Sequence, residues 1–494
     1  MYSFSEDQIE FYDFIHPFGG QLNESNRWVK MSRLIPWREL EKSYKKKFSK
    51  KRGAPAKSAR MAYGCLIIQE KCRFVDAELI EQITENPYLQ FFIGLKEYQS
   101  KPPLDSSTLV DFRKRISLED VQAAIELIFK EKEKTKEDSD KKDPPQKGQL
   151  IIDASCAPAD ITYPTDLKLL NHARKLTESI IDQLHAKDPQ KKKKPRTYKN
   201  RARKEFLKVV KRKRNSAKQF QQARRQQLSF VQRNLRHIEK LSQSVSLTVL
   251  DRVLYHKLLV ISEVSRQQEL MLKQNEKSCE GRIVNIAQAH VRPIVRGKAQ
   301  SKTEFGAKIS LSVQKGYSFL HRVSFENYNE CGDLQSQVEH YKKMNGFYPE
   351  SVHADKIYRT RENLAFCKEK GIRLSGPRLG RPPKDLKLSK AQKKQVRLDE
   401  GIRNAVEGKF GQAKRRFGLD KIMAKLAATS CTKIAISILV LNLEKLLRFY
   451  FVQKSFVLGT HNLRFRLLSL ILSIFEVIIG KTLPDTPLIR FKSF

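Results

Sequence analysis

The order of the predicted elements indicates an α/β fold that follows an all-α region. After residue 148, short apolar runs typical of buried strands alternate with segments whose apolar residues recur every three to four positions, as on one face of a helix. Before residue 131 only the helical pattern occurs. We therefore predict an N-terminal helical domain (1–130), a charged linker (131–148), a mixed α/β domain (149–445) and a C-terminal helical segment (446–494).

The N-terminal domain contains three clear helical patterns, over residues 59–68, 75–83 and 118–129. The residues from Asp105 to Thr108 are a plausible N-cap cluster for a further helix. Small helices close to Arg113, Lys114 and Arg115 would suit a DNA reader of the helix-turn-helix type. A bundle used only for packing or dimerisation explains the same pattern, so both interpretations stay open.

The mixed domain begins with a strand over residues 150–152 that ends at Asp153. Two alternating runs, 307–313 and 317–325, flank Gln314-Lys315-Gly316 and predict a β-hairpin. The remaining elements follow as a helix (334–344), a strand (351–354), a helix (359–370), a strand (372–374) and a helix (401–417). A helical, strongly basic insertion over residues 163–280 interrupts this order.

The charge of the chain predicts a polyanionic partner. Its 494 residues include 96 Lys and Arg against 54 Asp and Glu, which gives a formal net charge of +42. Such a surplus repels itself unless a polyanion relieves it, and nucleic acid is the first candidate. Seven scattered cysteines and the absence of a secretory signal favour a soluble cytoplasmic protein. The longest apolar stretch, 467–480, is too short to cross a membrane.

Two segments are candidates for DNA contact. Residues 191–225 hold 17 Lys or Arg and one acid, Glu205, which favours an arm that contacts phosphates over a merely solvated one. Gly380-Arg381-Pro382-Pro383 resembles a minor-groove hook, although a proline-rich loop is the simpler interpretation. The candidate DNA-binding residues are Lys191, Lys192, Lys193, Lys194, Arg196, Lys211, Arg212, Lys213, Arg214 and Arg381.

Three acids suggest a metal site. Asp153 and Asp355 follow predicted strands, and Glu407 lies in the helix after the last strand. Residues at the carboxyl ends of strands line the functional crevice of an open α/β sheet. Converging carboxylates need a cation, and Mg²⁺ or Mn²⁺ suits oxygen ligands; two such ions would support phosphoryl transfer. Alternatively, Asp153 only caps a turn and Glu407 pairs with Arg403 or Lys409.

The helix over residues 401–417 adds two cations to this site. Arg403, Glu407 and Lys414 share one face with Phe410 and Phe417. Arg403 could therefore orient the Glu407 carboxylate, and Lys414 could reach a phosphate next to the metals.

Asp153, Asp355 and the spacing Arg403-x-x-x-Glu407-x-x-x-x-x-x-Lys414 resemble the DDE transposases of bacterial insertion sequences, in the group with a tyrosine–arginine–glutamate–lysine signature. The phrases at 152–154, 163–167, 293–298, 304–308 and 354–358 look characteristic of a subgroup. One departure is Glu400, which occupies the place of the signature tyrosine; Tyr358 is one residue that could fill that role.

The resemblance implies a ribonuclease-H-like core in which Asp153, Asp355 and Glu407 hold two Mg²⁺ or Mn²⁺ ions, flanked by Arg403 and Lys414. It implies cleavage at transposon ends and strand transfer into target DNA. The partner would be double-stranded DNA, bound at terminal inverted repeats and target by a homodimer, and the basic insertion would hold the transposon end. Two alternatives remain: a ribonuclease-H-like nuclease without strand transfer, and a DNA-binding regulator with an inactive core.

Overall fold

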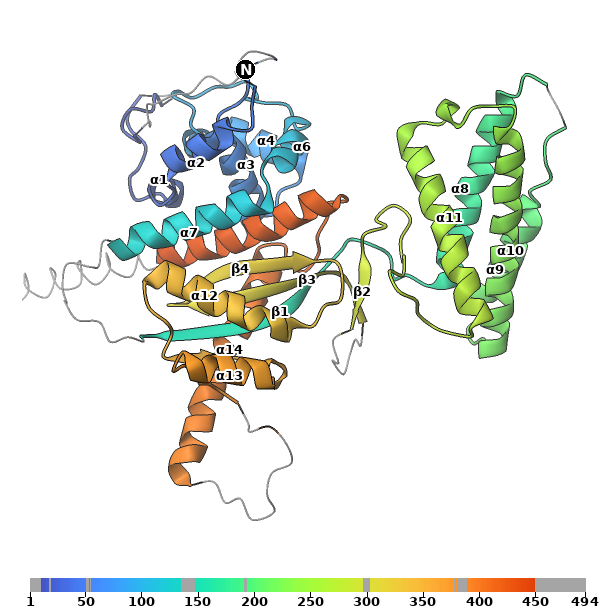
Figure 1. The fold of residues 1–494 in the computed structure, drawn as a ribbon. Helices are drawn as coiled ribbons and strands as arrows, with labels where there is room; N and C mark the ends of the chain where they lie inside the picture. Colours follow the sequence, from blue (N-terminus) through green and yellow to red (C-terminus); the bar gives the residue numbers. More distant parts are fainter. Residues whose placement is uncertain are drawn as a thin grey trace, which may run out of the picture.

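The computed structural model describes residues 10–16, 19–49, 53, 55–134, 147–190, 193–295, 303–376, 379 and 389–448. It confirms the α/β class: helices cover a six-stranded mixed sheet, and a separate group of helices lies beside it (Figure 1). Among the described residues, no helix is both long and apolar enough to cross a membrane.

The N-terminal region is helical, as predicted. Its helices are α1 (Arg27–Arg33), α2 (Trp37–Lys45), α3 (Ala59–Cys72), α4 (Asp76–Glu85), α5 (Pro87–Phe92), α6 (Thr108–Arg115) and α7 (Leu118–Lys134). The three helical patterns correspond to α3, α4 and α7. Trp28 and Trp37 both meet the Phe92 ring edge to face, with centroids 5.1 and 5.7 Å away, so these aromatic rings form part of the buried core.

The strands are β1 (Gln149–Pro158), β2 (Arg292–Val295), β3 (Thr303–Gln314), β4 (Tyr317–Ser324), β5 (Ser351–His353) and β6 (Arg373–Leu374). Their order in the sheet is β2-β3-β1-β5-β6, and β4 also pairs with β3. β1 is antiparallel to β3 and parallel to β5, so the sheet is mixed. The hairpin of β3 and β4 is confirmed. Its turn residues Lys315 and Gly316 both have positive φ, 50° and 76°, as a two-residue hairpin turn requires.

In the mixed part, the largest differences from the predicted elements are at β1, β2 and α14. β1 continues five residues past Asp153, because its pairing with β3 continues as far as Pro158. The short strand β2 was not predicted; it lies at the sheet edge, where Pro293 is tolerated. The last helix of the mixed part, α14 (Lys390–Arg416), begins eleven residues before the predicted start, because residues 390–398 carry no buried apolar pattern.

Helices cover both faces of the sheet. On one face α12 (Asp333–Asn345) and α13 (Arg361–Glu369) pack against Leu150 and Ile152 of β1. On the other face α14 and a helix over residues 427–448 pack against Ile151 and Ala157. In Figure 1, α7 and this second helix lie between the sheet and the N-terminal helices, and all of them share one apolar core.

Polar contacts reinforce this junction between the N-terminal helices and the rest of the chain. Glu70 of α3, 4% exposed, accepts hydrogen bonds from Lys433 Nζ and Ser437 Oγ, each at 2.7 Å. Lys71 forms an ion pair with Glu444 on the same helix. Because a buried carboxylate is stable only with partners of this kind, these contacts fix α3 against the helix over residues 427–448.

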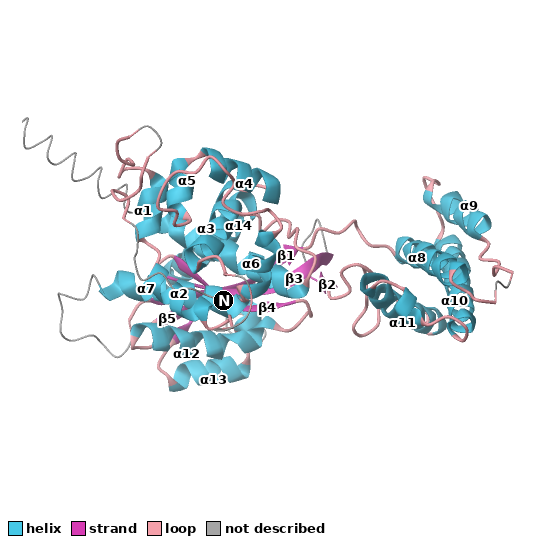
Figure 2. Ribbon diagram, turned by 90° about the horizontal axis from the view of Figure 1, so that it is seen from above, coloured by secondary structure: helices cyan, strands magenta, loops and turns pink. Residues whose placement is uncertain are grey.

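Between β1 and β2, the described residues form four α-helices: α8 (Asp166–Ala186), α9 (Lys199–Val210), α10 (Ala217–Ser242) and α11 (Arg252–Lys273). They form a bundle with its own apolar clusters, which include Leu170, Val231 and Ile261. Figure 2 shows the bundle set apart from the sheet and joined to it by loops. The helical character predicted for residues 163–280 therefore agrees with the structure.

A side chain at Gly306 is expected to destabilise the fold, because β3 pairs closely with β1 at this position. A Cβ atom at this position would lie 2.1 Å from the Ala157 carbonyl oxygen and 2.8 Å from the Pro158 Cα atom. Because both are backbone atoms of the paired strand, Gly306→Ala must push the strands apart. We expect a loss of about 3 kcal/mol in the free energy of unfolding, the upper end of the overpacking range. Gly332→Ala is the control, since no atom lies within 4 Å of its Cβ position; equal urea midpoints for the two variants would contradict this expectation.

Candidate functional site

The two predicted aspartates lie just beyond the residues that pair β1 with β5. β1 and β5 run parallel, and the last paired residues are Ile151 and His353. Asp153 and Asp355 each lie two residues beyond this pair. The backbone at Asp355 is still extended, with φ −69° and ψ 161°, so both aspartates follow the last paired residues by the same number of positions. Asp153 lies within β1, so the alternative that it caps a turn is wrong.

Alternation along the strands indicates which face of the sheet carries these acids. Leu150 and Ile152 belong to the core under α12 and α13, whereas Ile151 and Ala157 belong to the core that includes α14. Since successive side chains point to opposite faces, Asp153 shares the α14 face. On β5, His353 Nδ1 lies 3.6 Å from Asp399 Oδ1 of α14, so the same face carries His353; Asp355 follows two residues later, beyond the end of β5.

Helix α14 positions Glu407 over this face. Val406, Phe410 and Ala413 are buried and hold the helix against the sheet. Glu407 lies beside this buried row with its side chain 55% exposed, and Arg403 Nη1 is 3.3 Å from Glu407 Oε1. This ion pair is the one expected if Glu407 only pairs with a neighbouring cation. It also fixes the direction of the Glu407 carboxylate. Lys414 is half-buried two turns further along.

The three carboxylates do not form one closed cluster. Asp153 Oδ1 accepts a hydrogen bond from the Ala154 amide at 2.8 Å, and Asp355 Oδ1 accepts one from the Lys356 amide at 2.7 Å. Within the described ranges, no three His, Cys, Asp or Glu side chains gather closely enough to hold a metal ion. The donor chemistry still suits a hard cation, because the three side chains offer carboxylate oxygens alone.

An anchor that the sequence did not predict joins α14 to the strands. Asp399 is 9% exposed and accepts two hydrogen bonds from the Arg373 guanidinium of β6, at 2.7 and 2.9 Å. Burial acts against the charged carboxylate, but the hydrogen bonds from Arg373 and Gln395 outweigh it and lower the pKa of Asp399. Asp399 stands one turn before Arg403 and two before Glu407. That spacing was the one signal that could have revealed it.

Among the described residues, neither Tyr358 nor Glu400, which occupies the place of the signature tyrosine, forms a hydrogen bond with Glu407. Tyr358 is fully buried in the core under α12 and α13, on the face of the sheet opposite α14. Burial foremost, and then nearby acids that include Asp153, raise the pKa of Tyr358 far above its ordinary value. Glu400 is exposed on α14, one turn before Arg403.

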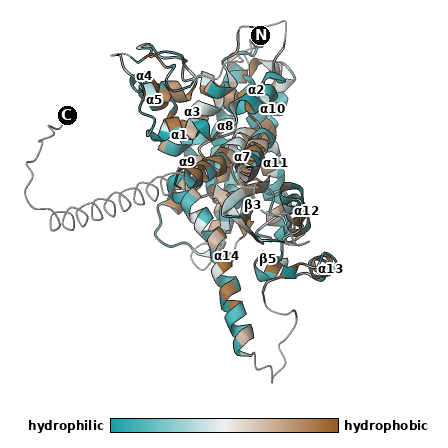
Figure 3. Cartoon of the chain, turned by 90° about the vertical axis from the view of Figure 1, so that its left-hand side faces the viewer, coloured by the Kyte–Doolittle hydropathy of each residue, from teal (hydrophilic) through white to brown (hydrophobic). Residues whose placement is uncertain are grey.

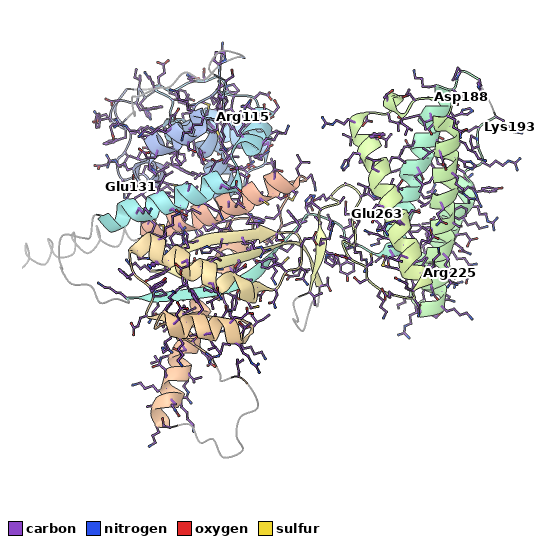
Figure 4. The ribbon with its side chains drawn as sticks, in the orientation of Figure 1. Arg115, Glu131, Asp188, Lys193, Arg225 and Glu263 are labelled. Atoms are coloured by element: carbon purple, nitrogen blue, oxygen red, sulfur yellow. The ribbon has the colours of Figure 1, made fainter. Side chains whose placement is uncertain are left out.

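The predicted DNA-contacting cations lie on the surface of the bundle. Lys193, Lys194 and Arg196 precede α9 and are exposed, and Lys194 pairs with Asp182 at 2.8 Å. The four residues 211–214 are also exposed, in the turn between α9 and α10. Figure 4 labels Lys193 towards one end of the bundle and Arg225 near the other, so the basic run extends along it. Lys191, Lys192 and Arg381 lie outside the described residues.

A basic pocket of about 340 Å³ lies between α10 and the segment before α9. Its lining includes Tyr198 and Arg233, whose guanidinium carbon lies 4.8 Å from the centre of the Tyr198 ring. Burial and the surrounding cations lower the pKa of His237, which lines the same pocket. Sequence reasoning missed the α10 side of this pocket, because Arg233, Arg236 and Lys240 lie beyond the dense basic run.

Comparison with known proteins connects two parts of the chain with transposition. Residues 352–444 match the family described as the transposase DDE domain, and residues 17–115 match a transposase domain (DUF772). The first match includes Asp355 and Glu407. A Rhizobium meliloti protein, described as an uncharacterized protein ORF8 in the nfe locus, is 28% identical over 148 residues, which cover 30% of this chain and 69% of that protein. No solved structure matches. The two transposase matches, in separate parts of the chain, confirm the resemblance to the DDE transposases of insertion sequences.

Proposed function

We propose that this protein is a DDE transposase that cleaves DNA at transposon ends and transfers the freed strand into target DNA, through a ribonuclease-H-like core. The observation that carries the proposal is that Asp153 and Asp355 each follow the last paired residues of the parallel strands β1 and β5 by two positions. Helix α14, which carries Glu407, packs on the face of the sheet that Asp153 shares. The match to a transposase DDE domain includes the second and third of these acids.

Asp153, Asp355 and Glu407 would hold two Mg²⁺ or Mn²⁺ ions. When bound, such ions supply Lewis-acid stabilisation of the phosphodiester and a more acidic water or hydroxyl nucleophile. Arg403 Nη1 lies 3.3 Å from Glu407 Oε1 and would keep this carboxylate directed along α14 until the carboxylate binds a metal ion. The Asp399–Arg373 contact sets the height of α14 against β5 and β6, and therefore the height of Glu407 relative to the two aspartates.

The remaining residues bind and orient DNA. The exposed cations at 193–196 and 211–214, together with the basic pocket on α10, would contact phosphates of the transposon end. Lys414 would contact a phosphate beside the catalytic acids, and Arg381 a narrow minor groove. The N-terminal region, which matches a transposase domain, would bind the DNA end or join two copies of the chain into a homodimer.

A strand-transfer assay with labelled ends tests this proposal. Purified protein, Mg²⁺, a labelled duplex and a plasmid target should yield nicked ends first and joined products later. Cuts without joined products would support the nuclease without strand transfer. Binding without metal-dependent nicking would support a DNA-binding regulator with an inactive core.

A further inference from the structure

The first nine residues of α14 form a free-standing basic rod, here called the α14 arm (residues 390–398). Every residue in it is exposed, including Val396 at 45% and Leu398 at 52%. Figure 3 shows α14 extending well beyond the sheet and the other helices. The arm contains four cations and no acid, and its cations recur at helical spacing along one face. Together with Leu398 they line a surface pocket of about 380 Å³; they are Lys390, Lys393, Lys394 and Arg397.

The arm is capped at its tip and anchored to the sheet at its base. At its tip, the Ser389 side chain accepts a hydrogen bond from the Gln392 amide at 3.2 Å, and the Gln392 side chain accepts one from the Ser389 amide at 3.0 Å. At its base, Asp399 is clamped by Arg373 of β6, and Gln395 Nε2 donates to Asp399 Oδ1 at 2.9 Å. The arm therefore continues the helix that carries Glu407 as one capped and anchored rod.

The positive charges of the arm lie at the end of the helix where they are unfavourable. A helix N-terminus carries partial positive charge and favours acids, but the first turn of α14 contains none and begins with Lys390. In the part of the chain that the structure describes, no ion pair is recorded for any of the four cations. No apolar burial offsets this cost along the arm. Such an arrangement becomes favourable when a polyanion lies against it.

We propose that the α14 arm lies in the major groove of the bound DNA duplex, a few base pairs from the cleavage site. The inference rests on the proposed function. A helix about 10–12 Å across fits a major groove about 12 Å wide. Lys390, Lys394 and Arg397 then reach phosphates and guanine edges, and the exposed Val396 and Leu398 side chains can contact thymine methyl groups. The axial distance from Lys394 to Glu407 is about 20 Å at 1.5 Å per residue, or about six base pairs of duplex.

The first test is binding to a labelled mixed-sequence duplex in Ca²⁺, with the full chain. Changing Lys390, Lys393, Lys394 and Arg397 together to Gln should flatten the slope of log affinity against log salt by about two to four, roughly one per lost phosphate contact. It should also remove protection of guanine N7, a major-groove atom, from methylation. The control exchanges the same lysines for Arg and Arg397 for Lys, and should keep both properties. An unchanged slope overturns the proposal, and a flatter slope without loss of N7 protection overturns the major-groove placement.

The second test measures position. A photoreactive amino acid at position 394 should crosslink to duplex bases about six base pairs from the scissile phosphate, including in the Asp153→Asn variant that does not cleave. Crosslinks scattered along the duplex would overturn the inference. This readout is independent of chemistry: failure of wild-type nicking with a localised crosslink counts against the proposed function alone.

Discussion

Replacing Asp153, Asp355 or Glu407 by alanine is expected to abolish DNA cleavage while end binding stays nearly intact. Each change would remove one metal ligand, and the in-line geometry of phosphoryl transfer fails with it. Loss of an outer-shell partner already costs about 10- to 100-fold at metal sites, so loss of a direct ligand should cost at least a hundredfold. Binding should not weaken, because each variant makes a chain of net charge +42 more positive.

Glu400→Gln provides the matched control for these three variants. Glu400 is exposed on the same helix as Glu407 and stands one turn before Arg403, but it has no place in the proposed triad. Nicking of a labelled duplex in Mg²⁺, followed over time, compares the four variants. A triad variant that cleaves within tenfold of the wild-type rate removes that residue from the site, and a control that fails equally shows that α14 tolerates no change of charge.

The course of the chain was predictable wherever burial leaves a regular apolar pattern. The β3–β4 hairpin, α3, α4 and α7 follow from spacing and turn residues alone, and so does the overall helical character of the insertion. The predictions failed where tertiary contacts override local pattern. Nothing near Asp153 signals that β1 continues to Pro158, because pairing with β3 supplies the hydrogen bonds there. Residues 390–398 remain helical through a cap at Ser389 and an anchor at Asp399, without apolar burial.

The sequence singled out residues for a candidate site, but it could not predict their arrangement. Asp153, Asp355 and Glu407 stood out as acids beside strands and on a helix in a very basic chain. The relative positions of the two aspartates depend on the parallel register of β1 with β5, which joins residues about 200 positions apart and leaves no local trace. The Arg373–Asp399 contact was missed for the same reason, since each residue alone looks like an ordinary surface charge. That Tyr358 lies on the opposite face likewise depends on long-range packing.

Neutralising the turn between α9 and α10 should weaken binding to every DNA sequence by a similar factor. Lys211, Arg212, Lys213 and Arg214 are all exposed there, so changing the four to Gln should not disturb the bundle. Each phosphate contact releases counterions and adds about −0.9 to the slope of log affinity against log salt. The quadruple variant should therefore lose roughly two to four units of slope, about one per lost contact.

Sequence preference should persist in this variant, because phosphate contacts position a protein on DNA without reading its bases. Exchanging the lysines for Arg and the arginines for Lys at positions 211–214 keeps the charge, so this control should retain the wild-type slope. Titrations of matched and scrambled duplexes at several salt concentrations measure both properties. If the Gln variant keeps the wild-type slope, the turn is a solvated segment, and the DNA-holding role of the bundle must rest on the pocket formed by Arg196, Arg233 and Lys240.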